Sequence, residues 1–433
     1  MRTDLIVVGG GAAGMMAAGR AAELGLSVCL VEKNERLGRK LAITGKGRCN
    51  ITNNCTVQEL VASVPSNGRF LYGAVSAFTP QDTMAFFENL GVPVKTERGN
   101  RVFPVSDRAL DVAQALEGWL RRNGCRVVRG EADSLLLEGE AAVGVRMKDS
   151  SVLHGGAVLV ACGGVSYPGT GSTGDGFRLA EQAGHTVTPL RPSLVPLIAG
   201  EEDCAELMGL SLRNIGLSVW DRKKKKEIYS DFGELLFTHF GLSGPVILSA
   251  SSHIREMEPG RYEARIDLKP ALTPEQLDAR LRRDFGENKN RDFANSLGAL
   301  LPRKLIPVAV RRSGIPGTLK CNAITREMRW DFLRLLKCFP FTVEGFRPIA
   351  EAIVTSGGVS VKELQPKTME SKLVRNLYFA GEVIDVDAYT GGFNLQIAWA
   401  TGRAAGVSAA AYLARGGRDE APSDPRNGWS EES

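Results

Sequence analysis

The sequence predicts an α/β fold in which a discontinuous Rossmann-like domain carries an inserted β-barrel-like subdomain and a helical subdomain. Three apolar runs predict this class: one precedes a glycine-rich turn at the N-terminus, one ends in glycines near residue 163, and one precedes a glycine near residue 381. Continuous apolar runs are typical of parallel strands buried on both faces. The length of 433 residues, at about 150 residues per domain, predicts two to three domains.

The composition is that of an ordinary globular protein. Hydrophobic residues make up 43% of the chain and charged residues 24%, so global disorder is excluded. The 49 glycines exceed the average usage of about 7% and indicate backbone positions with positive φ or close ligand approach. The net charge of +5 is a mild excess and argues against a nucleic-acid partner. We interpret the basic run 223–226 as a solvated hairpin turn.

The eight cysteines are scattered without CxxC or Cys/His zinc spacing. This usage favours a reducing compartment and predicts no structural metal. The N-terminal apolar run continues into glycine and alanine rather than a cleavage site, and no run of about 18 apolar residues occurs. We therefore expect a cytoplasmic protein without a membrane partner.

The first fifty residues carry a dinucleotide-binding fingerprint. The apolar run 4–8 leads into a GxGxxG turn and then a helix rich in small residues, and Glu32 ends the next predicted strand 18 positions after Gly14. The first glycine permits the turn, the second lets backbone N–H groups approach a pyrophosphate, the third lets the helix pack, and the acid binds a ribose. The residues expected to touch the dinucleotide here are Gly9, Gly11, Ala12, Ala13, Gly14, Glu32 and Lys33.

A second GxGxxG match, 169–174, serves as an internal control. Tyr167 and Pro168 separate it from the preceding predicted strand, and no acid follows at the required distance. We interpret it as a loop beside the same ligand rather than a second fingerprint.

Three later features favour FAD over NAD as the resident dinucleotide. A cationic, glycine-rich segment follows Glu32 and can wrap the pyrophosphate, although a flexible basic surface loop is the alternative. The strand near residue 160 ends in glycines where flavoprotein chains re-enter the dinucleotide domain, and a Gly-Glu pair near residue 381 can approach the ribityl chain. The helix that begins after residue 390 can place its N-terminus at the N1/C2=O edge of the flavin. The residues added by these features are Gly38, Arg39, Lys40, Thr44, Gly45, Gly47, Arg48, Cys49, Asn50, Ala161, Gly163, Gly164, Gly381, Glu382, Gly391, Gly392, Phe393 and Asn394.

Several motifs, in order, resemble the bacterial YhiN/BaiN-like flavoprotein family, which includes aminoacetone-oxidase-like members. They are TGKGRCN (44–50), ACGGVSYPGTGSTGDG (161–176), FTHFGLSGP (237–245), VTSGGV (354–359) and AGEVIDVDAYTGGFNLQ (380–396). The resemblance runs from residue 1 to about 415. It implies one FAD, a dinucleotide domain interrupted by an insertion, and an NAD(P)/FAD-dependent oxidoreductase, with some members linked to bile-acid reduction. It does not fix the substrate.

The remaining chain is assigned by periodicity and breaking residues. We expect helices at 77–90 and 109–123, strands at 125–129 and 135–148, and an approach of Ala132 and Asp133 to adenine. Short β-like segments fill 191–270, Thr273 and Pro274 open a helical stretch to about 337, and the segment 354–359 brings Gly357 and Gly358 toward the flavin. The expected division is 1–190 with 366–415 for the FAD-binding domain, 191–270 with 338–365 for the β-rich insertion on the substrate side, 271–337 for the helical subdomain, and 416–433 for a disordered tail.

No catalytic constellation stands out, so the catalytic residues beyond the flavin stay unknown. His239 is either connected with the substrate pocket or a buried structural histidine. Cys49 and Cys55 are a candidate redox pair, but five residues separate them where flavin-linked disulfide reductases need four, and Cys49 can instead lie near the flavin as an unpaired thiol.

The leading hypothesis is an FAD-dependent oxidoreductase that transfers a hydride through flavin N5 to or from a small organic substrate, with NAD(P)H as a possible transient donor. The alternatives are a flavin-binding redox sensor or regulatory protein, and an FAD-dependent RNA-modifying enzyme with a basic groove across the insertion. We expect a monomer or a homodimer.

Overall fold

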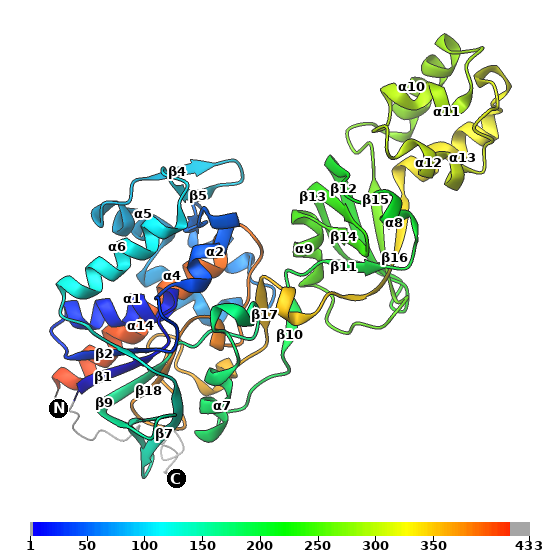
Figure 1. Ribbon diagram of the computed structural model, residues 1–433. Coiled ribbons are helices and arrows are strands. Elements are labelled where there is room, and N and C mark those ends of the chain that lie inside the picture. The colour runs from blue at the N-terminus through cyan, green and yellow to red at the C-terminus, as the bar shows by residue number, and fades with distance from the viewer. Residues whose placement is uncertain (1–2, 416–433) are drawn as a thin grey trace, which may run out of the picture.

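The computed structural model describes residues 3–415, and the tail expected to be disordered lies outside this range. Figure 1 shows three parts in line: a layered α/β domain, a β-barrel and a group of helices at the far end. The predicted fold class is confirmed, since the largest sheet has Rossmann-type order and the insertion contains a closed barrel.

The central sheet has the order β6-β2-β1-β9-β8-β7, and β18 also pairs with β9. β18 lies parallel to the C-terminal half of β9, whereas β8 pairs antiparallel with its N-terminal half. Four of the parallel strands, β1, β2, β9 and β18, are apolar and almost wholly buried where they pair, as expected for strands covered on both faces, whereas β6, which is parallel to β2, is mostly exposed. The strands are β1 (Thr3–Val8), β2 (Val28–Glu32), β6 (Arg126–Arg129), β7 (Ala132–Glu138), β8 (Ala141–Met147), β9 (Val152–Val160) and β18 (Leu377–Phe379).

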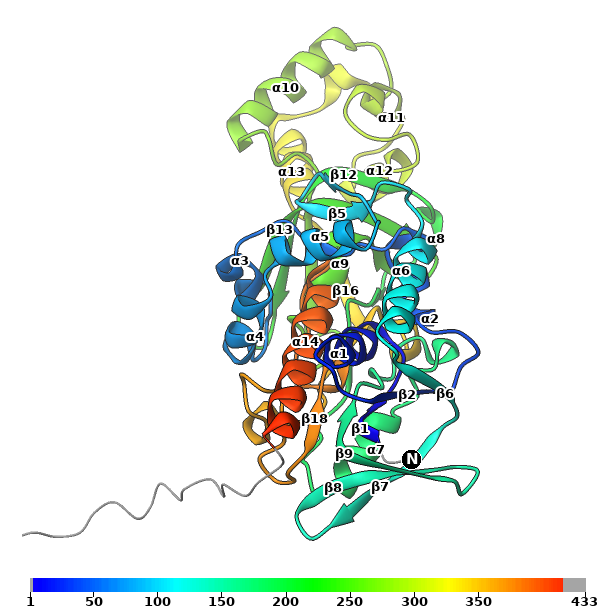
Figure 2. The same cartoon turned by 90° about the vertical axis from the view of Figure 1, so that its left-hand side faces the viewer.

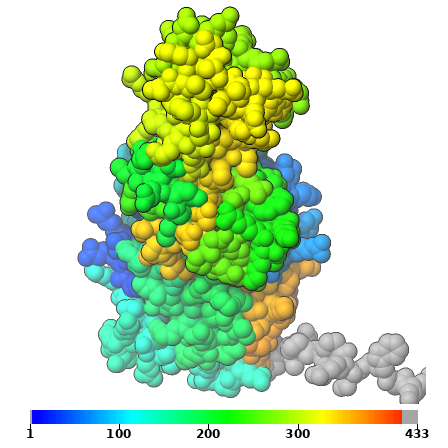
Figure 3. Space-filling view, turned by 90° about the vertical axis from the view of Figure 1, so that its right-hand side faces the viewer, coloured from blue at the N-terminus to red at the C-terminus, as the bar shows by residue number. Residues whose placement is uncertain are grey.

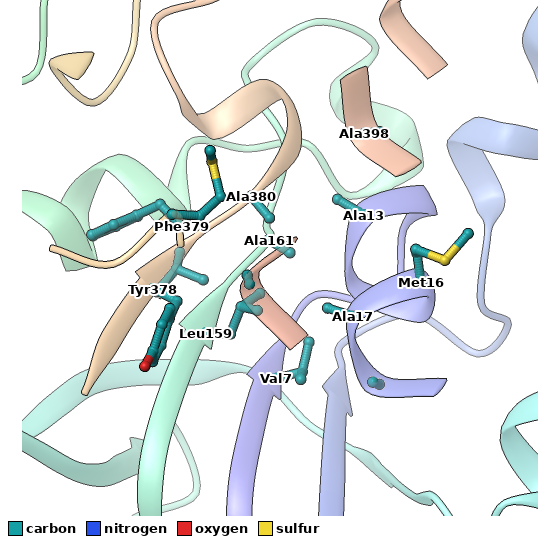
Figure 4. Packing of buried hydrophobic residues seen from close by; sticks show 14 of the residues in the cluster. Val7, Ala13, Met16, Ala17, Leu159, Ala161, Tyr378, Phe379, Ala380 and Ala398 are labelled. Atoms are coloured by element: carbon teal, nitrogen blue, oxygen red, sulfur yellow. The ribbon is translucent and has the colours of Figure 1, made fainter. Parts of the chain in front are cut away.

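The first and last helices, α1 (Ala12–Glu23) and α14 (Phe393–Ala414), cross at very close range. A Cβ at Gly402 would lie 2.3 Å from the Ala13 carbonyl oxygen, and one at Gly406 would lie 2.5 Å from that of Ala17. Figure 4 shows the small side chains that permit this contact, with Ala398 of α14 near Ala13 and with Val7 and Leu159 on the sheet below. The C-terminal helix is therefore part of the first domain's core.

The other helices of this domain cover the sheet and a small three-stranded sheet (Figure 2). The helix predicted over 77–90 is α5, which begins three residues later than predicted because Phe78 leaves the helical region and Thr79 caps the helix, with Pro80 at its first position. These elements are α2 (Arg39–Gly47), β3 (Thr52–Asn53), α3 (Val57–Ala62), α4 (Tyr72–Ala77), α5 (Pro80–Asn89), β4 (Val94–Glu97), β5 (Arg101–Pro104), α6 (Ala109–Arg122) and α7 (Asp175–Gln182).

A two-stranded antiparallel ribbon joins the first domain to the barrel. It consists of β10 (Arg191–Ser193) and β17 (Val354–Ser356), so the chain leaves and returns side by side. The barrel closes in the order β11-β14-β13-β12-β15-β16, and the basic run lies in the turn between β12 and β13. Its elements are β11 (Leu197–Ala199), α8 (Asp203–Glu206), β12 (Ser211–Asp221), β13 (Lys226–Thr238), β14 (Gly241–Ser243), α9 (Pro245–Ser251), β15 (Tyr262–Asp267) and β16 (Phe339–Phe346).

The barrel has its own apolar core, which continues into the helical subdomain. At the end of β12, Asp221 and Arg261 form an ion pair of 2.9 Å between side chains that are both under 4% exposed. Thr273 caps the first helix of the subdomain, as predicted, with a capping box to Gln276. The helices are α10 (Pro274–Glu287), α11 (Phe293–Ser296), α12 (Ile306–Ser313) and α13 (Arg326–Lys337), which stand beyond the barrel in Figure 3.

Candidate functional site

The glycine-rich turn between β1 and α1 has a different constraint at each glycine. Gly9 has φ +108°, and a Cβ there would lie 2.5 Å from the Ala161 carbonyl oxygen. A Cβ at Gly14 would lie 1.8 Å from the Gly9 oxygen, so this position lets the helix approach the turn. A Cβ at Gly11 would meet nothing within 4 Å, because this residue faces open space. Gly9 and Gly14 are therefore needed to form the turn, and Gly11 leaves open space above the start of α1.

Glu32, at the carboxyl end of β2, is buried beside this turn. Its Oε2 accepts from the Gly10 N–H at 2.7 Å, and its Oε1 accepts from the backbone and side-chain N–H groups of Asn34 at 2.7 and 2.6 Å. A carboxylate offers about four acceptor sites, so one remains for a ribose hydroxyl. The acid is thus held in a fixed orientation at the edge of the cavity.

A single large cavity of about 1020 Å³ runs from the glycine-rich turn to the barrel. The second GxGxxG cluster borders the same cavity through Thr170, Gly171 and Ser172. The residues predicted from the sequence that line it are Gly9, Gly11, Ala12, Ala13, Glu32, Lys33, Gly38, Arg39, Lys40, Thr44, Gly45, Arg48, Asn50, Ala132, Ala161, Gly163, Gly381, Glu382, Gly391, Gly392, Phe393 and Asn394.

Other predicted positions lie outside the lining. Gly14 packs the helix, and Gly164 faces the Thr355 side chain. Gly357 and Gly358 have φ of +90° and +144°, and a Cβ on either would collide with a backbone carbonyl oxygen. These two glycines therefore let separate backbone segments pass close to each other. Near the expected adenine position the lining comprises Gly130, Glu131 and Ala132 rather than Asp133. Gly47 and Cys49 are also absent from the lining.

Ionic contacts hold two cationic side chains of the lining, Lys40 and Arg48, in place. Lys40 Nζ lies 2.6 Å from Glu382 and 2.7 Å from the Ser166 hydroxyl. Glu382 also accepts from the Thr355 N–H at 2.8 Å, which ties the turn that follows β18 to the ribbon. Arg48 pairs with Glu97 at 2.5 Å and with Asp107 at 2.6 Å.

The start of α14 forms the opposite wall of the cavity. Gly391 and Gly392 have φ of +125° and +100°, and a Cβ at Gly392 would lie 2.3 Å from the Thr52 carbonyl oxygen. The Asn394 side chain spans the turn through the backbone of Ala388 at 2.9 and 2.8 Å. Asn50 lines the same wall, and its Oδ1 is buried without a hydrogen-bond partner among the described residues. A ligand with an N–H donor, such as a flavin ring, satisfies such an atom.

The barrel, which the sequence analysis expected on the substrate side, contributes a wall whose individual residues the sequence did not predict. Phe232 is 55% exposed, an unusual state for a large apolar side chain, and it faces the cavity from β13. The wall consists of Asn214, Phe232, Gly233, Glu234, Pro245 and Leu248. No local pattern marks these residues, because barrel closure brings them together from separate strands and a helix.

His239 and Cys49 lie outside the cavity lining, whereas Cys55 belongs to it. His239 is exposed, has its ring edge on Phe240 and is absent from the lining, so neither weighed reading describes it. Cys49 and Cys55 are both free thiols. Burial raises the pKa of Cys49 to about 12 and that of Cys55 to about 11, and only Cys55 lines the cavity.

Within residues 3–415, no group of three or more His, Cys, Asp or Glu side chains is arranged to hold a metal ion. In the same range, no helix has the length and hydropathy needed to cross a membrane.

Comparisons with known proteins show the family of this chain. Residues 3–408 match the HI0933-like protein Rossmann domain. The chain is 32% identical over 409 residues to the 3-dehydro-bile acid delta(4,6)-reductase of Clostridium scindens. This match covers 93% of this chain and 98% of the reductase. It is 30% identical over 413 residues to the ribosomal RNA dihydrouridine synthase of Haemophilus influenzae, with 94% and 98% covered.

Among solved structures, the 3-ketosteroid delta1-dehydrogenase of Sterolibacterium denitrificans, in complex with 1,4-androstadiene-3,17-dione, shares the fold with a TM-score of 0.53. The identity is 15%, and the match covers 95% of this chain and 99% of that chain. The match over almost the whole chain, with full-length relatives, shows that this protein belongs to the HI0933-like family of FAD-dependent oxidoreductases.

Proposed function

We propose that this protein is an FAD-dependent reductase for a carbon–carbon double bond conjugated to a carbonyl group, with NAD(P)H as the class of hydride donor. The support comes from one continuous cavity, which joins the glycine-rich turn to a partly apolar barrel wall. By their names, one relative reduces a 3-dehydro bile acid and another forms dihydrouridine, and both reactions saturate a double bond next to a carbonyl system.

In this proposal the lining residues of the first domain hold FAD. The N–H groups at the start of α1, above open Gly11, bind the pyrophosphate, and Glu32 binds the adenosine ribose. Glu382 and the start of α14 lie along the ribityl chain and the flavin, where Asn50 Oδ1 accepts from the ring. Bound FAD supplies a two-electron hydride carrier at N5.

The barrel wall then receives the substrate. Phe232 and Leu248 offer apolar surface for a flat ring, while Asn214 and Glu234 offer polar atoms at its rim. Apolar walls with a few polar groups are typical of small-molecule sites. This mixture supports a small cyclic enone as the preferred substrate class.

A uracil base within RNA is the second candidate, and three cations at the cavity favour it. Lys46, Arg98 and Arg101 line the cavity, are exposed, and have no acidic partner among the described residues. Such side chains bind phosphates. They lie on the first domain, not across the insertion where the RNA hypothesis expected its basic groove.

The test is anaerobic reoxidation of the reduced flavin. Reconstituted protein is reduced with NADPH, or with dithionite if NADPH fails, and mixed with 4-androstene-3,17-dione, with uridine-containing RNA, or with saturated androstane-3,17-dione as the control. We expect the oxidised flavin spectrum to return with at least one unsaturated probe and not with the saturated one. Reoxidation by oxygen alone would refute the reductase proposal and favour an oxidase or a redox sensor.

A further inference from the structure

A tyrosine and a histidine meet where the barrel contacts the first domain. Tyr389 lines the cavity directly before the start of α14, and His253 follows α9 of the barrel. The Tyr389 hydroxyl lies 2.7 Å from His253 Nε2, and the two rings stack at 5.5 Å with an interplanar angle of 25°. The ring of Tyr229 packs against His253 at 4.7 Å. The hydroxyl of Tyr389 is therefore fixed at the cavity by a residue 136 positions earlier in the chain.

The surroundings favour the neutral form of both rings. Burial is the main cause that raises the pKa of Tyr389, and Asp231 and Asp387 raise it further while Arg255 lowers it. Burial and then Arg255 lower the pKa of His253. Near pH 7 Tyr389 keeps its proton and His253 is uncharged. When Nε2–H donates to the tyrosine oxygen, the phenol hydrogen is free to point into the cavity.

The reductase reaction needs such a proton donor. Saturating a conjugated double bond adds a hydride at the β-carbon and a proton at the α-carbon. The cationic side chains Lys40 and Arg48 are held by carboxylates, and the Cys55 thiol has a pKa of about 11 without a partner that returns its proton. Tyr389 has both a position on the cavity and a hydrogen-bonded partner for reprotonation.

Resting on the proposed function, we propose that Tyr389 is the catalytic acid of this reduction and that His253 is its positioning and reprotonating partner. The β-carbon accepts a hydride from reduced FAD, the π electron pair moves to the α-carbon, and that carbon takes the phenol proton as the Tyr389 O–H bond breaks. The tyrosinate then takes the Nε2 proton of His253 as Nδ1 of the same ring takes a proton from solvent, so the imidazole stays neutral. NAD(P)H returns two electrons and a proton to the oxidised flavin as hydride.

The test compares Tyr389→Phe with Tyr229→Phe, a matched control that removes a hydroxyl from the other ring packed on His253 but leaves the cavity lining unchanged. Flavin reduction by NADPH and flavin reoxidation by the better unsaturated probe are timed separately by stopped flow. We expect Tyr389→Phe to slow reoxidation about 100-fold or more, the usual size of an acid–base contribution, with reduction and FAD content unchanged. Tyr229→Phe should behave as the wild type.

Two further readouts separate chemistry from packing. In the apoprotein, a tyrosinate titration by ultraviolet absorbance should lose one late-titrating tyrosine in Tyr389→Phe, while Tyr229, Tyr262 and Tyr378, whose pKa values burial also raises, remain. His253→Gln, which keeps an N–H donor, should retain more of the reoxidation rate than His253→Phe. A Tyr389→Phe rate within threefold of the wild type, or an equal loss in Tyr229→Phe, would overturn the assignment. A wild type that no unsaturated probe reoxidises would instead overturn the proposed function, and this inference with it.

Discussion

Replacing Gly11 with valine tests the placement of the pyrophosphate. The backbone at Gly11 has φ −81° and ψ −170°, an extended conformation that valine adopts readily. A Cβ there would meet nothing within 4 Å, so the new side chain fits the apoprotein without collision. It would occupy the open space above the first turn of α1, where we place the phosphates. The substitution should therefore block the ligand and not the fold.

The loss can be estimated from the donors that it covers. A hydrogen bond to a charged group contributes about 1.5–3 kcal/mol. If the valine separates two N–H donors of the first turn from the phosphates, FAD binding weakens by about 3–6 kcal/mol. At 1.4 kcal/mol per tenfold change, the Kd for FAD rises about 10²- to 10⁴-fold. The apoprotein should unfold at the wild-type urea concentration or slightly above it, because valine restricts the unfolded chain more than glycine.

The assay is calorimetric titration of apoprotein with FAD, combined with urea unfolding of the same sample. Gly298→Val is the matched control, since a Cβ at Gly298 also meets nothing within 4 Å and the residue is absent from the cavity lining. Near-normal FAD affinity in Gly11→Val would show that the phosphates bind elsewhere. A destabilised apoprotein would show that the argument from open space is wrong.

Three further predictions concern stability and thiol chemistry. Gly402→Ala should lower the free energy of unfolding by about 1–3 kcal/mol in urea titration, because its methyl group would overpack the contact between α14 and α1; an unchanged midpoint would contradict it. The Asp221 carboxyl has a pKa of about 2, lowered mainly by its hydrogen bonds to Arg261, so its contribution to stability is full above the unfolded pKa near 4 and is lost as the pH falls toward 2. Asp221→Asn should make the free energy of unfolding less dependent on pH between about 2 and about 4. An unchanged pH dependence would refute the assignment. Iodoacetamide should label exposed Cys338 in the native protein and Cys49 only after unfolding, as peptide mass mapping would show; native labelling of Cys49 would contradict its burial.

The sequence was informative where the backbone itself is constrained. The turn before α1 and the turn before α14 need glycines at positive φ or in close backbone contact, and these demands leave a readable pattern at Gly9, Gly14 and Gly392. Gly357 and Gly358, expected near the flavin, show the same backbone crowding but lie outside the cavity lining. A glycine pair reports a crowded backbone but does not say whether a ligand or another strand crowds it.

The sequence predicted that the barrel lies on the substrate side, but not which of its residues line the cavity. Phe232 and Leu248 carry no chemical signature, and only the register of a closed barrel brings them to one surface. The His253 contact depends on a hydrogen bond across 136 residues. Local patterns describe turns and caps well, whereas contacts between distant segments follow from the way whole subdomains are joined.

The side-by-side arrangement of β10 and β17 also sets the order in which the protein can assemble during its synthesis. The barrel needs only residues up to β16, so it can close while the rest of the chain is still being made. The first domain must wait for β18 and α14, which are synthesised after the barrel, and until then the surface of α1 that α14 covers stays unprotected. In the nascent chain the barrel is therefore folded while the first domain is not. The chain is most prone to aggregate between synthesis of β16 and synthesis of α14.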